Sequence, residues 1–159
     1  MKTDRSAVIL QLARELASES EDFFKVKGPG AGDKANHRFM AELRARAKRD
    51  LRTDYSEKKI CGEIGSAVDF YVKEERTIVE IALGLSAPQS EFHKDLFKAL
   101  LAKENGNDVT RLLFIAKPGA IKRHREPASV AIIQWLKKYY NISINIQELS
   151  PRKSIGRSE

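Results

Sequence analysis

The feature that most constrains the fold is a pair of short segments rich in β-branched and aromatic residues. They cover residues 67–72 (AVDFYV) and 77–83 (TIVEIAL), and four charged residues, KEER, separate them. Such segments favour strands, and a connection of this length joins antiparallel neighbours. The sequence therefore predicts a β-hairpin at this point of the chain.

The predicted register of this hairpin places two carboxylates side by side. If Val72 and Thr77 flank the loop, paired residues have numbers that add to 149, and Asp69 lies opposite Glu80. Residues directly opposite each other share one face of the sheet, with Cβ atoms about 5 Å apart. Two like charges on otherwise apolar strands repel, and a divalent cation is the simplest compensation. The alternative is a different register that leaves both acids in solvent or paired with basic loop residues.

The remaining chain alternates between helical and strand-like patterns. Predicted helices cover residues 5–24, 33–51, 91–103 and 127–140. Further predicted strands cover residues 58–62, 112–116 and 142–147. The continuous apolar run at 112–116 is typical of a strand covered on both faces, and a basic loop at 117–125 follows it. This order predicts one α/β domain over residues 1–150, with a mixed central sheet flanked by helices and a polar tail at 151–159.

Two of the predicted helices carry aromatic side chains, and helical spacing predicts which face of each helix they occupy. In the helix over 91–103, the side chains predicted to face inward are Phe92, Leu96, Phe97, Leu100 and Leu101. In the helix over 127–140, Trp135, Tyr139 and Tyr140 occur at helical spacing. Core packing is the favoured interpretation of these three rings, and stacking on nucleic-acid bases is the alternative.

The charge of +7 is distributed unevenly along the chain. Residues 63–110 carry nine acidic and five basic side chains, whereas residues 33–62 carry nine basic and five acidic ones, and residues 111–159 carry ten basic and three acidic ones. A solubilising surface is one interpretation. The other is a polyanion-binding surface around an acidic centre, which suits a nuclease because basic flanks hold phosphates while carboxylates hold a metal.

Several classes of protein are excluded or disfavoured by the composition. A single cysteine, Cys61, excludes an internal disulfide framework and a cysteine-based zinc cluster. No run of eighteen apolar residues predicts a membrane span, and the N-terminus lacks the features of a signal peptide. The expected location is the cytoplasm.

The hairpin and the elements around it resemble the PD-(D/E)xK superfamily of restriction-endonuclease-like nucleases. The core of that family is a helix, a three-stranded meander, a helix and a further strand, with an aspartate on the second strand and (D/E)xK on the third. The matching positions are Asp69 in SAVDFYV and Glu80 in TIVEIAL, followed by the helix EFHKDLFKALLAKE and the strand RLLFIAK. The likeness covers about residues 33–150 and implies an αβββαβ core, with residues 1–32 as an N-terminal helical extension.

The resemblance implies a metal-dependent endonuclease that hydrolyses phosphodiester bonds. Asp69 and Glu80 would bind Mg²⁺ or Mn²⁺, with Glu42 on the preceding helix as an outer ligand. In such a site the metal lowers the pKa of a bound water and stabilises charge on the phosphate.

One position departs from the pattern of the family. The lysine expected two residues after the acid is Ala82 here, and alanine offers no donor or acceptor. Some members carry this lysine on a neighbouring helix, so we predict Lys94 as the relocated catalytic residue, with Lys98 behind it. A solvated surface lysine is the alternative for Lys94.

The predicted partner is a nucleic acid, with DNA favoured over RNA, and no membrane. The side chains predicted to contact its backbone are Arg44, Arg46, Arg49, Lys122, Arg123 and Arg125. Enzymes of the family often act as homodimers, which by analogy makes a homodimer a state to test. Because of Ala82, a non-catalytic nucleic-acid-binding or assembly module that retains the nuclease fold is the alternative function. A protein-interaction domain without a polyanion ligand is a third interpretation.

Overall fold

The computed structural model describes residues 4–24, 31–83 and 88–150. Its strands are β1 (Ser56–Lys58), β2 (Val68–Val72), β3 (Thr77–Ala82), β4 (Arg111–Ala116) and β5 (Ser143–Glu148). Its helices are α1 (Arg5–Glu19), α2 (Ala31–Leu51), α3 (Pro88–Glu104), α4 (Ala120–His124) and α5 (Pro127–Tyr140), with short 3-10 helices at Glu21–Phe24, Gly62–Ile64 and Lys73–Glu75. The predicted tail at 151–159 lies outside the described residues.

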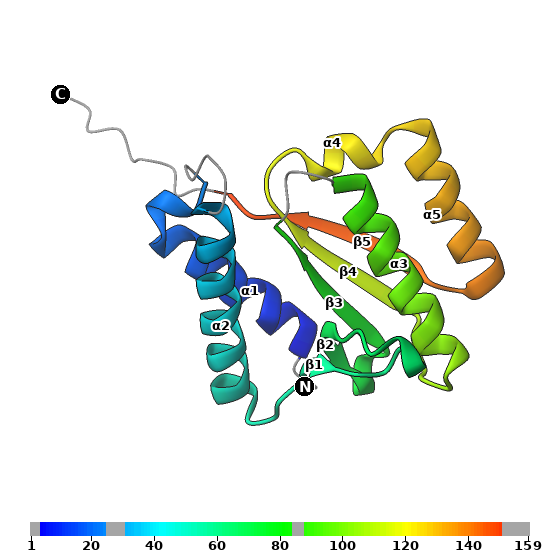
Figure 1. Ribbon diagram of the computed structural model, residues 1–159, viewed down its shortest axis with the longest axis horizontal. Helices are drawn as coiled ribbons and strands as arrows, with labels where there is room; N and C mark the ends of the chain where they lie inside the picture. Colours follow the sequence, from blue (N-terminus) through cyan, green and yellow to red (C-terminus); the bar gives the residue numbers. More distant parts are fainter. Residues whose placement is uncertain (1–3, 25–30, 84–87, 151–159) are drawn as a thin grey trace.

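The five strands form one mixed sheet in the order β1-β2-β3-β4-β5. The first three strands are antiparallel neighbours, and β3, β4 and β5 run parallel to one another. Helices α1 and α2 lie on one face of the sheet, and α3 and α5 lie on the other (Figure 1). The predicted α/β class with a mixed central sheet is confirmed. No helix in the described part of the chain is long and apolar enough to cross a membrane.

The hairpin has the predicted register. Phe70 pairs with Val79 and Val72 with Thr77, so the paired residue numbers add to 149. The connection is a 3-10 turn over Lys73–Glu75 followed by Arg76 in the left-handed conformation, a common way to close a hairpin loop of this length. Asp69 and Glu80 are the next residues beyond the last paired position on these adjacent strands.

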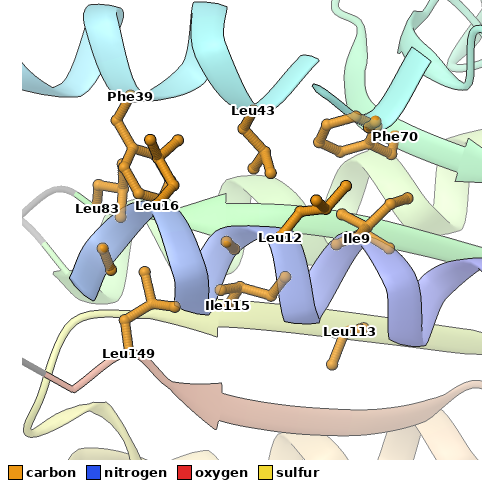
Figure 2. Packing of buried hydrophobic residues seen from close by; sticks show 14 of the residues in the cluster. Ile9, Leu12, Leu16, Phe39, Leu43, Phe70, Leu83, Leu113, Ile115 and Leu149 are labelled. Carbon is orange, nitrogen blue, oxygen red and sulfur yellow. The ribbon is translucent and has the colours of Figure 1, made fainter. Parts of the chain in front are cut away.

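The α1–α2 face of the sheet covers an apolar core (Figure 2). Ile9 and Leu12 of α1 and Leu43 of α2 are buried against Phe70 and Ile115 of the sheet. Helix α1 begins at a side-chain cap, because Asp4 Oδ1 accepts a hydrogen bond from Ala7 N at 3.0 Å. This layer closes the sheet on the side away from α3.

The α3–α5 face covers a second core, so β4 is buried on both sides. Leu112 and Phe114 of β4 face α3 and α5, whereas Leu113 and Ile115 face α1 and α2. All four are buried. The prediction that the run at 112–116 is covered on both faces is confirmed.

Two predicted segments differ from the structure. The short strand is β1 at Ser56–Lys58 and not residues 58–62, because Ile60 and Cys61 pack beside α3 without pairing to a strand. The basic stretch predicted as a loop contains α4, whose start is held by Glu148: its Oε1 accepts hydrogen bonds from Gly119 N at 3.0 Å and Ile121 N at 2.9 Å. The stabilising contact comes from a distant strand, which local sequence patterns do not reveal.

The rotation of α3 and α5 about their axes also differs from the prediction. Phe97 was expected inside, but its side chain is 64% exposed, and Asp95 and Lys98 are buried instead. On α5, Trp135 is 45% and Tyr139 63% exposed, so the core assignment of these rings is wrong. Phe92 of α3 is buried against the sheet as predicted, whereas Phe97 of α3 and Trp135 and Tyr139 of α5 lie on stripes that face away from it.

A candidate active site between the hairpin and α3

The strands β2 and β3 part at the two acids. Their backbone pairing extends to Phe70 and Val79. At the next position, the carboxylates of Asp69 and Glu80 contact the backbone N–H groups of the opposite strand. Asp69 Oδ2 accepts a hydrogen bond from Ile81 N at 2.8 Å, and Glu80 Oε2 lies 3.4 Å from Asp69 N. The carboxylates thus lie at the point where the hairpin opens, held by the backbone of the opposite strand.

The two acids differ in their access to solvent. The side chain of Asp69 is 25% exposed, whereas that of Glu80 is 2% exposed. Glu80 is covered by α3 and is paired on the sheet with Phe114 of β4. A substrate or ion in solution therefore reaches this pair from the side of Asp69.

A lysine from α3 lies against the buried acid. Lys98 Nζ is 2.9 Å from Glu80 Oε1 and 2.9 Å from Asp95 Oδ1, and it donates a hydrogen bond to Ala67 O at 3.3 Å. The Ala67 carbonyl accepts a hydrogen bond from this ammonium group, whereas the two carboxylates contact it as ion pairs, and Glu80 Oε1 is buried without a hydrogen-bond partner among the described residues. Lys98 is consequently held in one place at the acid pair.

The charges in this cluster do not balance. Burial and the nearby carboxylates of Asp95 and Asp69 raise the pKa of Glu80 well above its ordinary value. Burial also raises the pKa of Asp95, despite its contact with Lys98. Burial alone would lower the pKa of Lys98, but the two carboxylates outweigh it and raise this pKa. Three carboxyl groups around one ammonium leave a site that favours additional positive charge.

This geometry distinguishes the two lysines considered for the missing motif position. The side chain of Lys94 is exposed, and it forms no ion pair with any described residue. Lys98 follows four residues later, one further turn along α3 and rotated toward the sheet. A sequence signal for it existed: Asp95 and Lys98 stand three residues apart between the apolar Phe92 and Ala99, a spacing that places the charged pair on one stripe of the helix with them.

The structure does not bring Glu42 to the acid pair. Its Oε1 accepts a hydrogen bond from Arg46 Nε at 2.8 Å, one turn later on α2. Arg46 also donates two hydrogen bonds to Glu19 of α1, at 2.9 and 2.7 Å, so this predicted nucleic-acid contact is occupied by two acids. Within the described residues no three His, Cys, Asp or Glu side chains are arranged to hold a metal ion. Arg46 instead links α2 to Glu19 of α1, and Glu42 pairs with Arg46 within α2.

Two carboxylates are nevertheless a sufficient protein contribution for some cations. Mg²⁺ commonly takes one or two carboxylates and fills its other positions with water and substrate phosphate. Asp69 and Glu80 offer hard oxygen donors, and burial with neighbouring carboxylates raises the pKa of Glu80 and of Asp95, so a nearby cation would stabilise their charged forms. These residues fit Mg²⁺ or Mn²⁺, with Asp69 and Glu80 as the side chains that would hold it.

The predicted basic residues of α2 have different surroundings. Arg44 lies beside the site, with Nη2 3.9 Å from Asp69 Oδ1 and Nη1 3.2 Å from Glu57 Oε1. Arg49 lies on the exposed surface and pairs with the adjacent Asp50 at 2.7 Å. Of the predicted α2 contacts, Arg44 is the one that the structure places at the acid pair.

The basic residues of α4 border the other end of the site. Arg123 and Ala82 line a cavity of about 70 Å³, together with Asp95 of the cluster described above. Lys122 and Arg125 are exposed on the same short helix and at its end. The space next to Ala82 is thus bordered by a guanidinium group on one side and by the carboxylate partner of Lys98 on the other.

Comparisons with protein-family models, with curated proteins and with solved structures found no match.

Proposed function

We propose that this protein is a metal-dependent nuclease that hydrolyses nucleic-acid phosphodiester bonds at Asp69, Glu80 and Lys98. The observation that carries the proposal is the contact of Lys98 Nζ with Glu80 Oε1, at 2.9 Å, beside the predicted acid pair. It supplies from α3 the cationic side chain that Ala82 cannot supply. The succession of α2, the β1–β2–β3 meander, α3 and β4 is compatible with a restriction-endonuclease-like core.

The environment of Lys98 determines the role that it can have. Its raised pKa and its three oxygen partners keep it protonated, so it has no lone pair with which to act as a general base. A fixed ammonium group can instead orient a water molecule and stabilise negative charge on a phosphate. Asp95 holds this group in place from the same helix.

The acid pair provides the anionic half of the site. Asp69 is accessible to solvent and Glu80 is fixed beneath α3, so the pair combines one open and one rigid carboxylate. When bound there, a divalent cation supplies a water of lowered pKa and a counter-charge for the phosphate. Arg44, next to Asp69, is positioned to contact an adjoining phosphate of the substrate.

Cleavage assays test this function directly. Supercoiled plasmid, linear duplex and single-stranded oligonucleotides are incubated with Mg²⁺, Mn²⁺ or EDTA, and we expect cleavage that requires the metal. Asp69→Asn keeps the shape and an oxygen acceptor for Ile81 N but removes a charged ligand, and we expect it to abolish cleavage. Metal binding has a second measurement, because Mg²⁺ should raise the melting temperature of the wild type more than that of Asp69→Asn.

Two lysine variants on one helix separate the competing assignments. We expect Lys98→Arg to lower the cleavage rate strongly while nucleic-acid binding persists, and Lys94→Ala to lower it little. Lys73→Ala, on the exposed hairpin turn, controls for the loss of one positive charge. A rate that depends on Lys94 and is indifferent to Lys98 would contradict the proposed site.

The alternative function is a non-catalytic nucleic-acid-binding module, and one observation favours it. Lys98 is already engaged by two carboxylates and a carbonyl, and Ala82 leaves the motif position without a polar group. On this hypothesis the wild type binds DNA with affinity that falls linearly on a log–log plot against salt, yet cleaves no substrate with any metal. Preserved binding without cleavage would decide for this alternative.

A further inference from the structure

The outer surface of α3 and α5 is unusually apolar for a face that no described segment covers. Phe97 of α3 is 64% exposed, and Trp135 and Tyr139 of α5 are 45% and 63% exposed. The rings form one group, since the Trp135 centroid lies 5.0 Å from that of Tyr140 and 6.3 Å from that of Tyr139. Isolated exposed apolar residues are common, whereas a contiguous aromatic patch marks an interaction surface.

A groove lies within the same patch. It has a volume of about 250 Å³ and is lined by Leu96, Phe97 and Leu100 of α3 and by Ile132, Trp135 and Leu136 of α5. The two helices lie side by side on the outside of the molecule (Figure 1). Phe97, the most exposed of these side chains, stands at the rim of the groove. A projecting ring and an apolar recess in one patch are what a two-fold self-contact requires, because each copy then fills the recess of the other.

The charges on α3 show the same self-complementarity. Lys94, Phe97, Leu101 and Glu104 follow one another at spacings of three, four and three residues, so they lie on one stripe of the helix. Lys94 and Glu104 are exposed, and neither forms an ion pair with a described residue. If two copies of α3 meet antiparallel about a centre between these positions, Lys94 of each protomer lies opposite Glu104 of its partner.

The size of the patch is compatible with a contact between two proteins. The exposed parts of its four aromatic side chains amount to roughly 400 Å² of apolar surface, given that such side chains present 150–250 Å² each. A standard interface takes about 800 Å² from each partner. The patch therefore supplies about half of this area as an apolar centre, around which Lys94, Glu104 and Lys138 would form the charged rim.

We propose that the outer face of α3 and α5 is a homodimer interface in which α3 of one protomer runs antiparallel to α3 of its partner. This inference stands on the described patch, groove and charges and does not depend on nuclease activity. The interface places the buried site of each protomer on the inner side of α3, away from the contact. Both sites thus stay open in the dimer.

The first test is the mass of the protein in solution as a function of concentration, by sedimentation or light scattering. We expect a dimer for the wild type and a monomer for Phe97→Asp. Ile64→Asp is the matched control, because Ile64 is a 54% exposed apolar residue outside the patch. It should remain dimeric. A wild type that is monomeric at every concentration would overturn the proposal.

A charge exchange tests the antiparallel arrangement. Lys94→Glu and Glu104→Lys should each weaken the dimer, raising its Kd by about tenfold because each change acts at two symmetry-related contacts. The double variant Lys94→Glu/Glu104→Lys should restore most of the affinity. A dimer that is indifferent to Phe97→Asp and to both single reversals forms through another surface and contradicts the proposal.

The fluorescence of Trp135, the single tryptophan of the chain, distinguishes the competing occupant. Dimerisation should change its emission on dilution. A monomeric wild type whose Trp135 emission is quenched by oligo(dT) would instead assign this face to nucleic-acid bases and overturn the dimer.

Discussion

The two helical layers of this protein place their charges in opposite ways. Between α1, α2 and the sheet, the contact is made by apolar side chains such as Leu12, Leu16 and Leu43, and the ion pairs lie outside. Beneath α3, Glu80 and Lys98 are buried and paired, while Phe97 of α3 and Trp135 and Tyr139 of α5 face outward. The α1–α2 layer has apolar side chains inside and ion pairs outside, as is usual in a folded domain. The α3–α5 layer has a buried ion pair inside and aromatic side chains outside.

This contrast separates structural from functional surfaces. An apolar interior stabilises a fold without any requirement for a partner. A buried charge lowers stability unless a partner group or an ion compensates it. A contiguous exposed apolar patch marks a surface that binds another molecule. The α1–α2 layer therefore maintains the sheet, and the α3–α5 layer carries the features that point to function.

The largest effect on stability is expected for the buried ion pair of the α3–α5 layer. Lys98→Met leaves Glu80 buried without its ammonium partner and should lower the free energy of unfolding by about 3–5 kcal/mol. Denaturant unfolding at neutral pH measures this loss. The double variant Lys98→Met/Glu80→Gln should recover part of it, since Glu80 then carries no charge, while Asp95 still lacks its ammonium partner. If the double variant loses the sum of both single effects, the two side chains do not act as a pair.

A comparable but purely apolar effect is expected in the other layer. Leu43 is fully buried between α2 and α1, and Leu43→Ala should lower the free energy of unfolding by about 2–5 kcal/mol. Phe97→Ala is the matched truncation of an exposed side chain and should change monomer stability by no more than about 0.5 kcal/mol. Equal losses of stability for Leu43→Ala and Phe97→Ala would show that the Phe97 side chain is packed in the monomer.

A small effect is expected for the ion pairs on the outside of α1 and α2. Arg46 joins Glu19 and Glu42, and Arg46→Ala should lower the free energy of unfolding by less than about 1 kcal/mol, because exposed pairs contribute little. The difference from the wild type should shrink as salt is added. A loss that salt does not reduce would indicate that the guanidinium group acts through packing.

The smallest effect concerns the pH dependence contributed by α4. Burial, aided by the charge of Arg123, lowers the pKa of His124 below its ordinary 6.5, so the folded state favours the neutral ring. The stability that this provides is present above pH 6.5 and is lost as the pH falls toward the lowered pKa. Melting temperatures between pH 8 and pH 5 should fall more for the wild type than for His124→Phe, which keeps a ring against Phe92. If the melting temperatures of the wild type and of His124→Phe fall equally with pH, the predicted contribution of His124 is wrong.

The amino-acid sequence alone predicted the parts of the molecule that depend on neighbouring residues. The register of the hairpin followed from two β-rich segments and a short loop, and it is confirmed from Val72–Thr77 to Phe70–Val79, next to Asp69 and Glu80. The helix α5 has its predicted bounds, with Pro127 at its first turn and Asn141 in the left-handed conformation at its end. Both are local rules, because turn length and helix termini involve residues close together in the chain.

The rotation of each helix was decided by contacts across the fold. Phe97 and Trp135 are more apolar than Lys98, so a pattern of hydrophobicity turns them inward. In the structure Lys98 is inside because Glu80 and Asp95 offset the cost of burying it, and Glu80 comes from a strand eighteen residues earlier. A buried ion pair is a property of two segments together. No single stretch of sequence contains it, which is why the acid pair followed from the hairpin, whereas the sequence placed Lys94 ahead of Lys98 as the lysine that meets it.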